Sequence, residues 1–283
     1  MIKRYSSIKG AGLGLRRAFI DSLASKPPID VDFYEVAPEN WIHVGGRFGK
    51  QFRSLSERFS FVSHGLSLSL GSPSPLDETF ILEIKEFLNL HRIRKYSEHL
   101  SYCSDDGHLY DLMPIPFTLE AVEYVARRIR RVQDLLEQRI AIENVSYYAA
   151  PGKEMEEIDF LNAVLNQADC ELLLDINNIY VNSVNHGYDA EAFLSAIPAE
   201  RIAYAHIAGH YVEAEDLIVD THGAEVISPV WSLLEKAYQQ FGVFPTLLER
   251  DFNIPSLPEL VDEVRTIRSV QTNTLCVKDV RYG

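Results

Sequence analysis

The chain has 283 residues, of which 46% are hydrophobic and 24% are charged, as is ordinary for a folded globular protein. Its 27 Lys and Arg against 41 Asp and Glu give a formal net charge of −14, which argues against a nucleic-acid partner because such proteins usually present a basic face to phosphates. No window approaches the roughly 18 apolar residues of a membrane span, and the start MIKRYSSIKGAG lacks the apolar stretch of a secretory signal.

Eight short apolar runs recur along the chain, and most are followed by a longer segment of helical periodicity. Several are nearly continuous in Ile, Leu, Val, Phe and Tyr, which is typical of strands buried on both faces. The predicted strands lie in residues 10–16, 31–38, 59–65, 95–102, 139–146, 170–178, 201–209 and 244–251.

Amphipathic segments separate these runs, and residues 118–137 are the clearest. Their apolar positions recur every three or four residues with Arg and Glu opposite, and Thr118 is a suitable N-cap. Pro229 and Pro258 stand at helix starts, where a missing N–H is harmless. The other predicted helices lie in residues 76–92, 155–168, 188–196, 228–241 and 257–270.

Eight strand–helix alternations predict an α/β fold, the (β/α)8 TIM barrel, with an open doubly wound sheet as the alternative. No linker or low-complexity tract interrupts residues 1–283, so we expect one domain, with 271–283 as a C-terminal appendage. Cys103, Cys170 and Cys276 are scattered and form no C-x-x-C motif, which favours a reduced, cytoplasmic compartment.

Six consecutive predicted strands end in a residue that can bind a metal ion. Because the strand ends of such a barrel meet at one face, these side chains should converge. Taken singly, each His has an ordinary structural role and each Asp can cap a helix. Repeated at every strand, one shared ligand set is the better interpretation. The candidates are His64, His99, Glu143, Asp175 with Asn178 after it, His206, Asp220 and His222 in the following loop, and Glu249.

The residue types restrict the metal. Cysteine is missing from the strand ends, and imidazole with carboxylate suits iron, manganese or zinc. One or two mononuclear sites would leave several of these groups buried and unpaired. Two or three ions that share bridging carboxylates, commonly about 3.5–4 Å apart, could use them all.

The ligand order resembles the xylose-isomerase-like superfamily of TIM barrels with multinuclear centres. Within it, the chain is most similar to the multinuclear non-haem iron-dependent oxidative enzymes, which include the methanobactin-biosynthesis oxygenase. The phrases GAGLGLR, YEVAPENW, SHGLSLSLGS, YSEHLSY, IENVS, LLDINNIYVN, HIAGH and DTHG carry this resemblance over residues 9–250. GAGLGL alone would be weak and is no dinucleotide-binding loop.

The resemblance implies a ligand arrangement. His64 and His99 bind one ion, and Glu143 bridges it to a second ion that also takes Asp175, His206 and Glu249. Asp220 and His222 hold a third ion, with Asn178 nearby. Other polar residues are candidates for supporting the ligands or contacting substrate: Glu98, His210, Glu39 and Asn40. We expect the remaining histidines to lie on the surface or in loops: His43, His91, His108 and His186.

The resemblance also implies a function. An iron centre activates O₂ and oxidises a cysteine, or a similar residue, of a ribosomally made precursor peptide. A partner protein that binds the leader sequence of that peptide is a further candidate. Residues 102–117 form either a long loop at the rim of the pocket or a plain surface loop.

Three other functions stay open. The three-zinc abasic-site endonuclease has a similar ligand order, but it has a His where this chain has Asn178, and the acidic balance suits DNA poorly. Sugar isomerisation usually calls for a lysine near the metals, and the predicted strand ends offer none. Metal binding without catalysis is the fourth interpretation.

Overall fold

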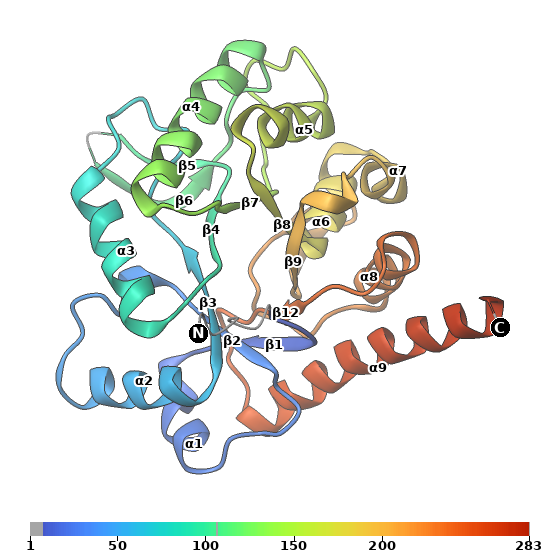
Figure 1. The fold of residues 1–283 in the computed structure, drawn as a ribbon. Helices are drawn as coiled ribbons and strands as arrows, with labels where there is room; N and C mark the ends of the chain where they lie inside the picture. Colours follow the sequence, from blue (N-terminus) through green and yellow to red (C-terminus); the bar gives the residue numbers. More distant parts are fainter. Residues whose placement is uncertain (1–7, 106, 283) are drawn as a thin grey trace.

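Eight parallel strands close into a barrel in the computed structural model, which describes residues 8–105 and 107–282 (Figure 1). Pairing of the first strand with the last excludes an open sheet, so the predicted (β/α)8 fold is confirmed. In order around the barrel the strands are β1 (Ala11–Gly14), β2 (Phe33–Val36), β3 (Ser60–Gly65), β4 (Tyr96–His99), β7 (Ala141–Glu143), β8 (Glu171–Asp175), β9 (Ile202–Ile207) and β12 (Thr246–Leu248).

Helices surround the barrel on its outside, as Figure 1 shows. The predicted N-cap is confirmed, because the Thr118 side chain accepts a hydrogen bond from the Ala121 backbone. The helices are α1 (Ile20–Ser25), α2 (Gly46–Arg58), α3 (Glu78–His91), α4 (Leu119–Leu136), α5 (Glu157–Ala168), α6 (Ile176–His186), α7 (Ala190–Ser195), α8 (Ser228–Phe241) and α9 (Leu257–Tyr282), with 3-10 turns at Arg17–Phe19, Pro38–Asn40 and Ala199–Arg201.

Two layers of inward-facing side chains fill the barrel. Six apolar residues form its floor: Phe33, Val62, Ala141, Leu173, Tyr204 and Leu247. Side chains two residues apart on a strand point to the same face. The next inward layer on the same six strands is therefore Glu35, His64, Glu143, Asp175, His206 and Glu249. The polar layer stands directly above the apolar floor, at the carboxyl ends of the strands.

Glycine makes room for this floor on the first strand. An added Cβ at Gly12 would lie 2.5 Å from Cζ of Phe33, which is closer than real contacts allow. Gly12 of the GAGLGL motif therefore serves close packing inside the barrel.

Two antiparallel hairpins stand between barrel strands. Residues 102–117 were predicted as a loop, but they contain β5 (Tyr102–Ser104) paired with β6 (His108–Met113). A second hairpin, β10 (Tyr211–Ala214) with β11 (Leu217–Val219), follows β9.

The C-terminal segment 271–283 was predicted as an appendage, but it begins within α9, which continues to Tyr282. Gln271 and Thr274 are buried, and the Gln271 amide donates to the carbonyl of Gly10. The start of the segment is thus part of the packed helical layer. The predicted lack of a signal peptide rests largely on residues 1–7, which lie outside the described residues. None of the described helices combines the length and apolar character needed to cross a membrane.

Candidate metal centre

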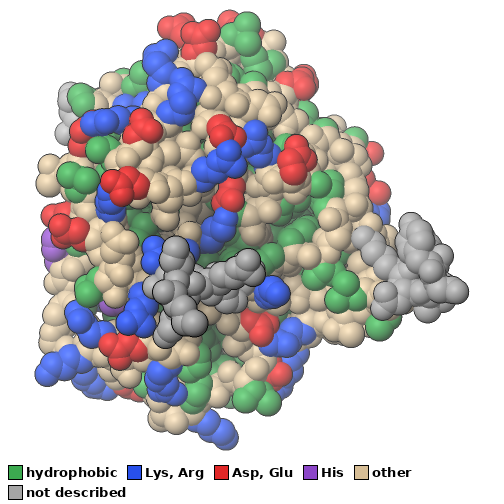
Figure 2. Space-filling model, in the orientation of Figure 1, with side chains coloured by type: hydrophobic (Ala, Val, Ile, Leu, Met, Phe, Trp, Pro, Cys, Tyr) green, Lys and Arg blue, Asp and Glu red, His purple; other side chains and the backbone are tan. Residues whose placement is uncertain are grey.

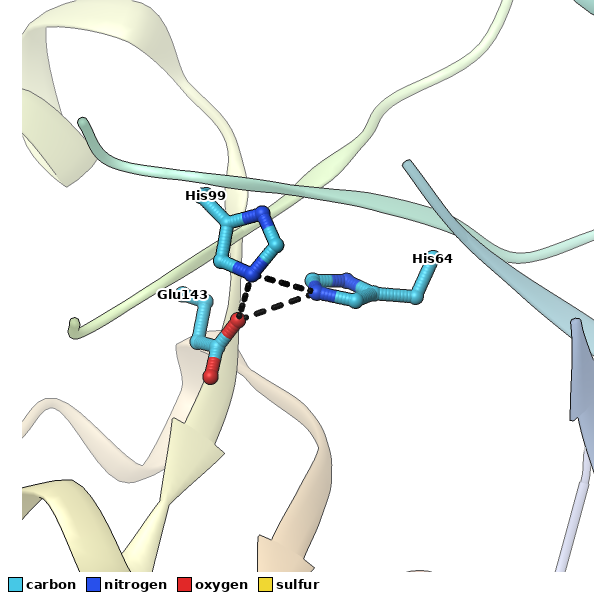
Figure 3. A group of neighbouring side chains, drawn as sticks. All are labelled: His64, His99 and Glu143. Atoms are coloured by element: carbon cyan, nitrogen blue, oxygen red, sulfur yellow. Dashed lines mark hydrogen bonds and ion pairs between the residues drawn. The ribbon is translucent and has the colours of Figure 1, made fainter. Parts of the chain in front are cut away.

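Three side chains at the ends of β3, β4 and β7 point toward one another (Figure 3). His64 Nε2 lies 3.1 Å from His99 Nε2 and 3.1 Å from Glu143 Oε2, and His99 Nε2 lies 3.4 Å from the same oxygen. Ligand atoms that each lie about 2.1 Å from a shared ion are separated by roughly 3.0–3.4 Å in tetrahedral or octahedral geometry. The trio therefore has the spacing of a metal site.

A second group of donors surrounds His206, which is fully buried. Its Nδ1 lies 2.9 Å from Glu249 Oε2 and 3.9 Å from Asp175 Oδ2. Donor atoms of Glu143, Asp175 and His206 also lie within 4.8 Å of one another. Glu143 thus belongs to both the first and the second group, as a bridging carboxylate must.

A third group lies at the edge of the cluster. Donor atoms of Asp175, His222 and Glu249 lie within 4.8 Å of one another, and His222 Nε2 is 2.8 Å from Asp220 Oδ1. Asp220 is held by Ser146 and Asn177, which donate hydrogen bonds of 3.0 and 2.8 Å. His222 has a φ of 48°, a strained conformation for a residue other than glycine.

Unsatisfied polar atoms test whether these residues fit metal ions. Among the described residues, the buried atoms without a hydrogen-bond partner include His99 Nδ1, Glu143 Oε2, Asp175 Oδ2, His206 Nδ1 and His222 Nε2. A buried polar group without a partner is destabilising by about 1–3 kcal/mol. Most of these atoms belong to the contacts described above. Imidazole and carboxylate donors without thiolates fit iron, manganese or zinc.

The charged groups of the centre lie close together and are largely buried, so they shift one another's pKa values. Burial by itself raises the pKa of Glu143, but the facing His99 and His64 outweigh it and lower that pKa to about 2. Burial lowers the pKa of His99, but Glu143 and Glu98 outweigh it and raise that pKa to about 9. Burial and the Glu143 charge raise the pKa of Asp175 well above its ordinary value. Cations in the centre would relieve this repulsion between the carboxylates.

Asp175 has two separate tasks at the junction of β8 and α6. Its Oδ1 accepts a 2.6 Å hydrogen bond from the Asn178 backbone and so caps α6, while its Oδ2 faces the other ligands. Asn178 was a candidate ligand. Its Nδ2 donates to Glu143 Oε1 at 3.2 Å and to the Asn144 carbonyl, whereas its Oδ1 has no partner.

The four supporting candidates occupy different places. Glu98 is buried, accepts from the Tyr96 hydroxyl at 2.8 Å and lies 3.8 Å from His99 Nδ1. Glu39 accepts from the Leu66 backbone and the Ser67 hydroxyl.

His210 and Asn40 belong to none of the donor groups found among the described residues. His210 is buried, its Nδ1 lies 2.7 Å from Asn177 Oδ1, and its ring stacks on Tyr180. Asn40 is exposed, and its carbonyl accepts from Arg17.

The histidines that were expected on the surface or in loops differ in their burial. His43 is exposed, as predicted. His186, at the end of α6, is also exposed, as predicted, whereas the prediction is wrong for His91, which is partly buried in α3. The His91 ring packs at a tilt against Phe52 and Phe87, and the His186 ring stacks on Tyr147. His108 lies on β6, and its side chain is outside the described residues.

A cavity of about 750 Å³ opens above the cluster. His99, Glu143, Asp220, His222 and Glu249 lie at its base. Its walls include Leu109, Asp111, Leu112 and Met113 of the β5–β6 hairpin, together with Tyr148 and Phe252. The rim interpretation of residues 102–117 is therefore supported.

Sequence reasoning missed Glu35, which is buried on β2 and lies 3.0 Å from His206 Nε2. The signal was present, since a glutamate within the apolar run VDFYEV is costly to bury without a partner. The predicted strand extended to residue 38 and so placed the candidates at Glu39 and Asn40, whereas β2 ends at Val36.

A buried polar group next to the centre holds the loop after β7. Asn182 accepts from the Tyr147 backbone and donates to the Val145 carbonyl and to Glu157. This loop carries Tyr148, whose hydroxyl accepts from the Asp220 backbone. Burial raises the pKa of Glu157 to about 7.

We expect Glu157→Gln to stabilise the protein at alkaline pH. The folded state keeps the proton of Glu157 up to about pH 7, but the unfolded chain loses it near 4.5, so the stability this group contributes is present below 4.5 and is lost as pH rises through 7. Above about pH 7, the free energy of unfolding of the variant should exceed that of wild type by about 3 kcal/mol. Urea unfolding across pH measures the difference. Glu156→Gln, at an exposed neighbour, is the control, and parallel curves for Glu157→Gln and wild type would contradict the prediction.

Comparison with known proteins agrees with the fold and with the predicted family. Solved structures of similar fold include the 3-keto-D-glucoside 4-epimerase YcjR of E. coli (TM-score 0.63, 10% identity, 92% of this chain and 99% of that one). Another is the IOLI protein, solved with a zinc atom (TM-score 0.60, 14% identity, 94% and 97%). A xylose isomerase domain protein of Alicyclobacillus acidocaldarius gives a TM-score of 0.56 at 13% identity, over 94% and 99%.

Sequence relatives are much closer. A UPF0276 protein of Shewanella loihica is 64% identical over 264 residues, which cover 93% of this chain and 95% of the relative. The UPF0276 protein PA3283 of Pseudomonas aeruginosa is 57% identical over 264 residues, 93% of each. The family model "RiPP precursor modification enzyme MbnB/TglH/ChrH" matches residues 10–272. The chain belongs to this family.

Proposed function

We propose that the chain is a multinuclear non-haem iron enzyme that uses O₂ to oxidise a cysteine, or a similar residue, of a ribosomally made precursor peptide. The observation that carries the proposal is the convergence of imidazole and carboxylate donors, several of them without hydrogen-bond partners, at the base of an open cavity. Membership of a family of precursor-modifying enzymes supports the peptide substrate.

The donor groups suggest which residues hold which ion. His64, His99 and Glu143 would hold the first. Glu143 would share the second with Asp175, His206 and Glu249. Asp220 and His222 would hold the third, close to Asp175 and Glu249, with Asn178 orienting Glu143. Iron, once bound, supplies one-electron redox chemistry and a position for O₂, whereas zinc and manganese are the alternative metals for the same donors.

The protein itself contributes binding and the exclusion of water. The cavity has apolar wall residues, among them Leu66, Leu109 and Phe252, above a charged base. This arrangement suits a side chain that enters with its polar end toward the metals while the peptide backbone stays outside. Arg16 pairs with Asp251 and lies 3.7 Å from Glu249 Oε1, so it orients the carboxylates on that side.

The net charge and the one face drawn in Figure 2 give little support to a nucleic-acid substrate. Figure 2 shows Lys and Arg interspersed with Asp and Glu over the face drawn, without a continuous basic stripe. The net charge of −14 would also repel phosphates. A metal-dependent hydrolase of the abasic-site endonuclease type is therefore the alternative that the experiment must exclude. A partner that binds the peptide leader is a further part of the proposal.

Metal analysis and O₂ uptake test the proposal. Protein purified without oxygen should carry two or more iron ions per chain. It should consume O₂ when a cysteine-bearing precursor peptide is added, and the same peptide with serine in place of cysteine should give no uptake. Tightly bound zinc together with cleavage of abasic DNA would contradict the proposal.

A further inference from the structure

A buried hydrogen-bond chain below the metal centre joins His64 to His206. His64 Nδ1 lies 2.7 Å from Ser97 Oγ, which lies 2.8 Å from the Tyr204 hydroxyl. Tyr204 donates to Glu35 Oε2 at 2.7 Å, and His206 Nε2 lies 3.0 Å from the same oxygen. All five residues are at most 4% exposed, so water does not compete for these bonds.

The hydroxyl groups allow only one direction for this chain. Tyr204 has a single O–H, which it donates to Glu35, so it can only accept from Ser97. Ser97 then uses its single O–H on Tyr204 and can only accept from His64 Nδ1–H. In a neutral ring, this leaves the lone pair of His64 on Nε2, the atom that faces His99 and Glu143.

The contact between Glu35 and His206 places the ring proton on the opposite nitrogen, compared with His64. Glu35 Oε2 accepts from His206 Nε2–H, which leaves the lone pair of a neutral ring on Nδ1. That atom lies 2.9 Å from Glu249 Oε2 and belongs to the second donor group. By contrast, the Nδ1 atom of His99 has no hydrogen-bond partner.

We propose that Glu35 is a positioning residue that sets opposite tautomers of His64 and His206, through Tyr204 and Ser97 on one side and directly on the other. One carboxylate thereby couples the first and second ion positions. The inference rests on the metal-binding part of the proposed function and is independent of the peptide substrate. Partners of this kind typically change metal affinity about 10- to 100-fold.

Three substitutions separate the two arms. Tyr204→Phe and Ser97→Ala each interrupt the arm to His64 and leave the Glu35–His206 contact in place. Glu35→Leu removes both arms. Tyr238→Phe is the matched control, since Tyr238 is also fully buried and bonded, to Thr246 and Gln271 in the outer layer.

Anaerobic calorimetry with Fe²⁺ alone gives the first readout. Tyr204→Phe and Ser97→Ala should each weaken one binding step about 10- to 100-fold, and Glu35→Leu should weaken two. Tyr204 and Ser97 act through one hydrogen-bond chain. The double variant Tyr204→Phe/Ser97→Ala should therefore bind Fe²⁺ no more weakly than either single variant. Tyr238→Phe should bind as wild type. Unchanged Fe²⁺ affinity in Tyr204→Phe, or additive losses in the double variant, would overturn the inference.

A second readout needs no metal. NMR of the metal-free protein with ¹⁵N-labelled histidine should show the proton of His64 on Nδ1, and Tyr204→Phe should remove this preference; the signal is assigned with His64→Gln. If wild type binds no Fe²⁺, the proposed function fails, yet this measurement still tests the hydrogen-bond chain. A His64 proton on Nε2 in the wild type would exclude the chain.

Discussion

Glu143→Ala should lose most of its bound metal and essentially all activity. Glu143 Oε2 lies 3.1 and 3.4 Å from the two histidine nitrogens of the first donor group, and another contact places Glu143 in the second group with Asp175 and His206. Removing a shared ligand opens two ion positions at once. With the ions gone, Asp175 and Glu249 also lose the positive charge that would offset the repulsion between them. We expect metal affinity to fall by more than about 100-fold, which exceeds the effect of removing a residue that only orients a ligand.

The measurement is the metal content of the anaerobically purified variant, followed by O₂ uptake with peptide. Glu171→Ala is a matched control, because Glu171 also lies on a barrel strand but at the opposite end of β8, where it pairs with Lys95. Circular dichroism establishes that both variants fold. Wild-type metal content and activity in Glu143→Ala would exclude the bridge and, with it, the ligand assignment.

The closed barrel and most of the donors were predictable because both follow from local periodicity. Strand alternation has a period of two, so an apolar floor residue such as Leu173 predicts an inward residue at Asp175. Polar residues at such positions are few and easy to notice. Helix α4 was equally clear, since its apolar stripe and its Thr118 cap agree.

Other features depend on contacts that the sequence pattern does not reveal. Helix α2 contains two glycines, and α6 is rich in Asn and β-branched residues, so neither has a strong helical propensity. The cap from Asp175 and the packing against the barrel stabilise α6 instead. A buried carboxylate in the run VDFYEV was a usable signal for Glu35, but its partner His206 lies 171 residues away, and only the fold brings the two together. The hairpin β5–β6 was missed because its polar residues are equally typical of a loop.

Glu249→Ala should remove the second and third ions while leaving the first. Glu249 Oε2 lies 2.9 Å from His206 Nδ1 and 3.5 Å from His222 Nδ1, so one carboxylate serves both groups. Glu249 is not part of the first donor group, which consists of His64, His99 and Glu143. The geometry of that group therefore does not depend on Glu249. We therefore expect the iron content to fall to about one ion per chain, with activity reduced more than about 100-fold because two neighbouring ions are needed.

A graded pair of variants makes this prediction specific. His222→Ala removes a ligand of the third group alone, so it should retain two ions where Glu249→Ala retains one. Iron analysis and Mössbauer spectra of the two variants measure the number and the kinds of site that remain. Equal iron content in the two variants would show that Glu249 does not bridge. A carboxylate that binds at one ion position removes only one ion when it is lost, as His222 does.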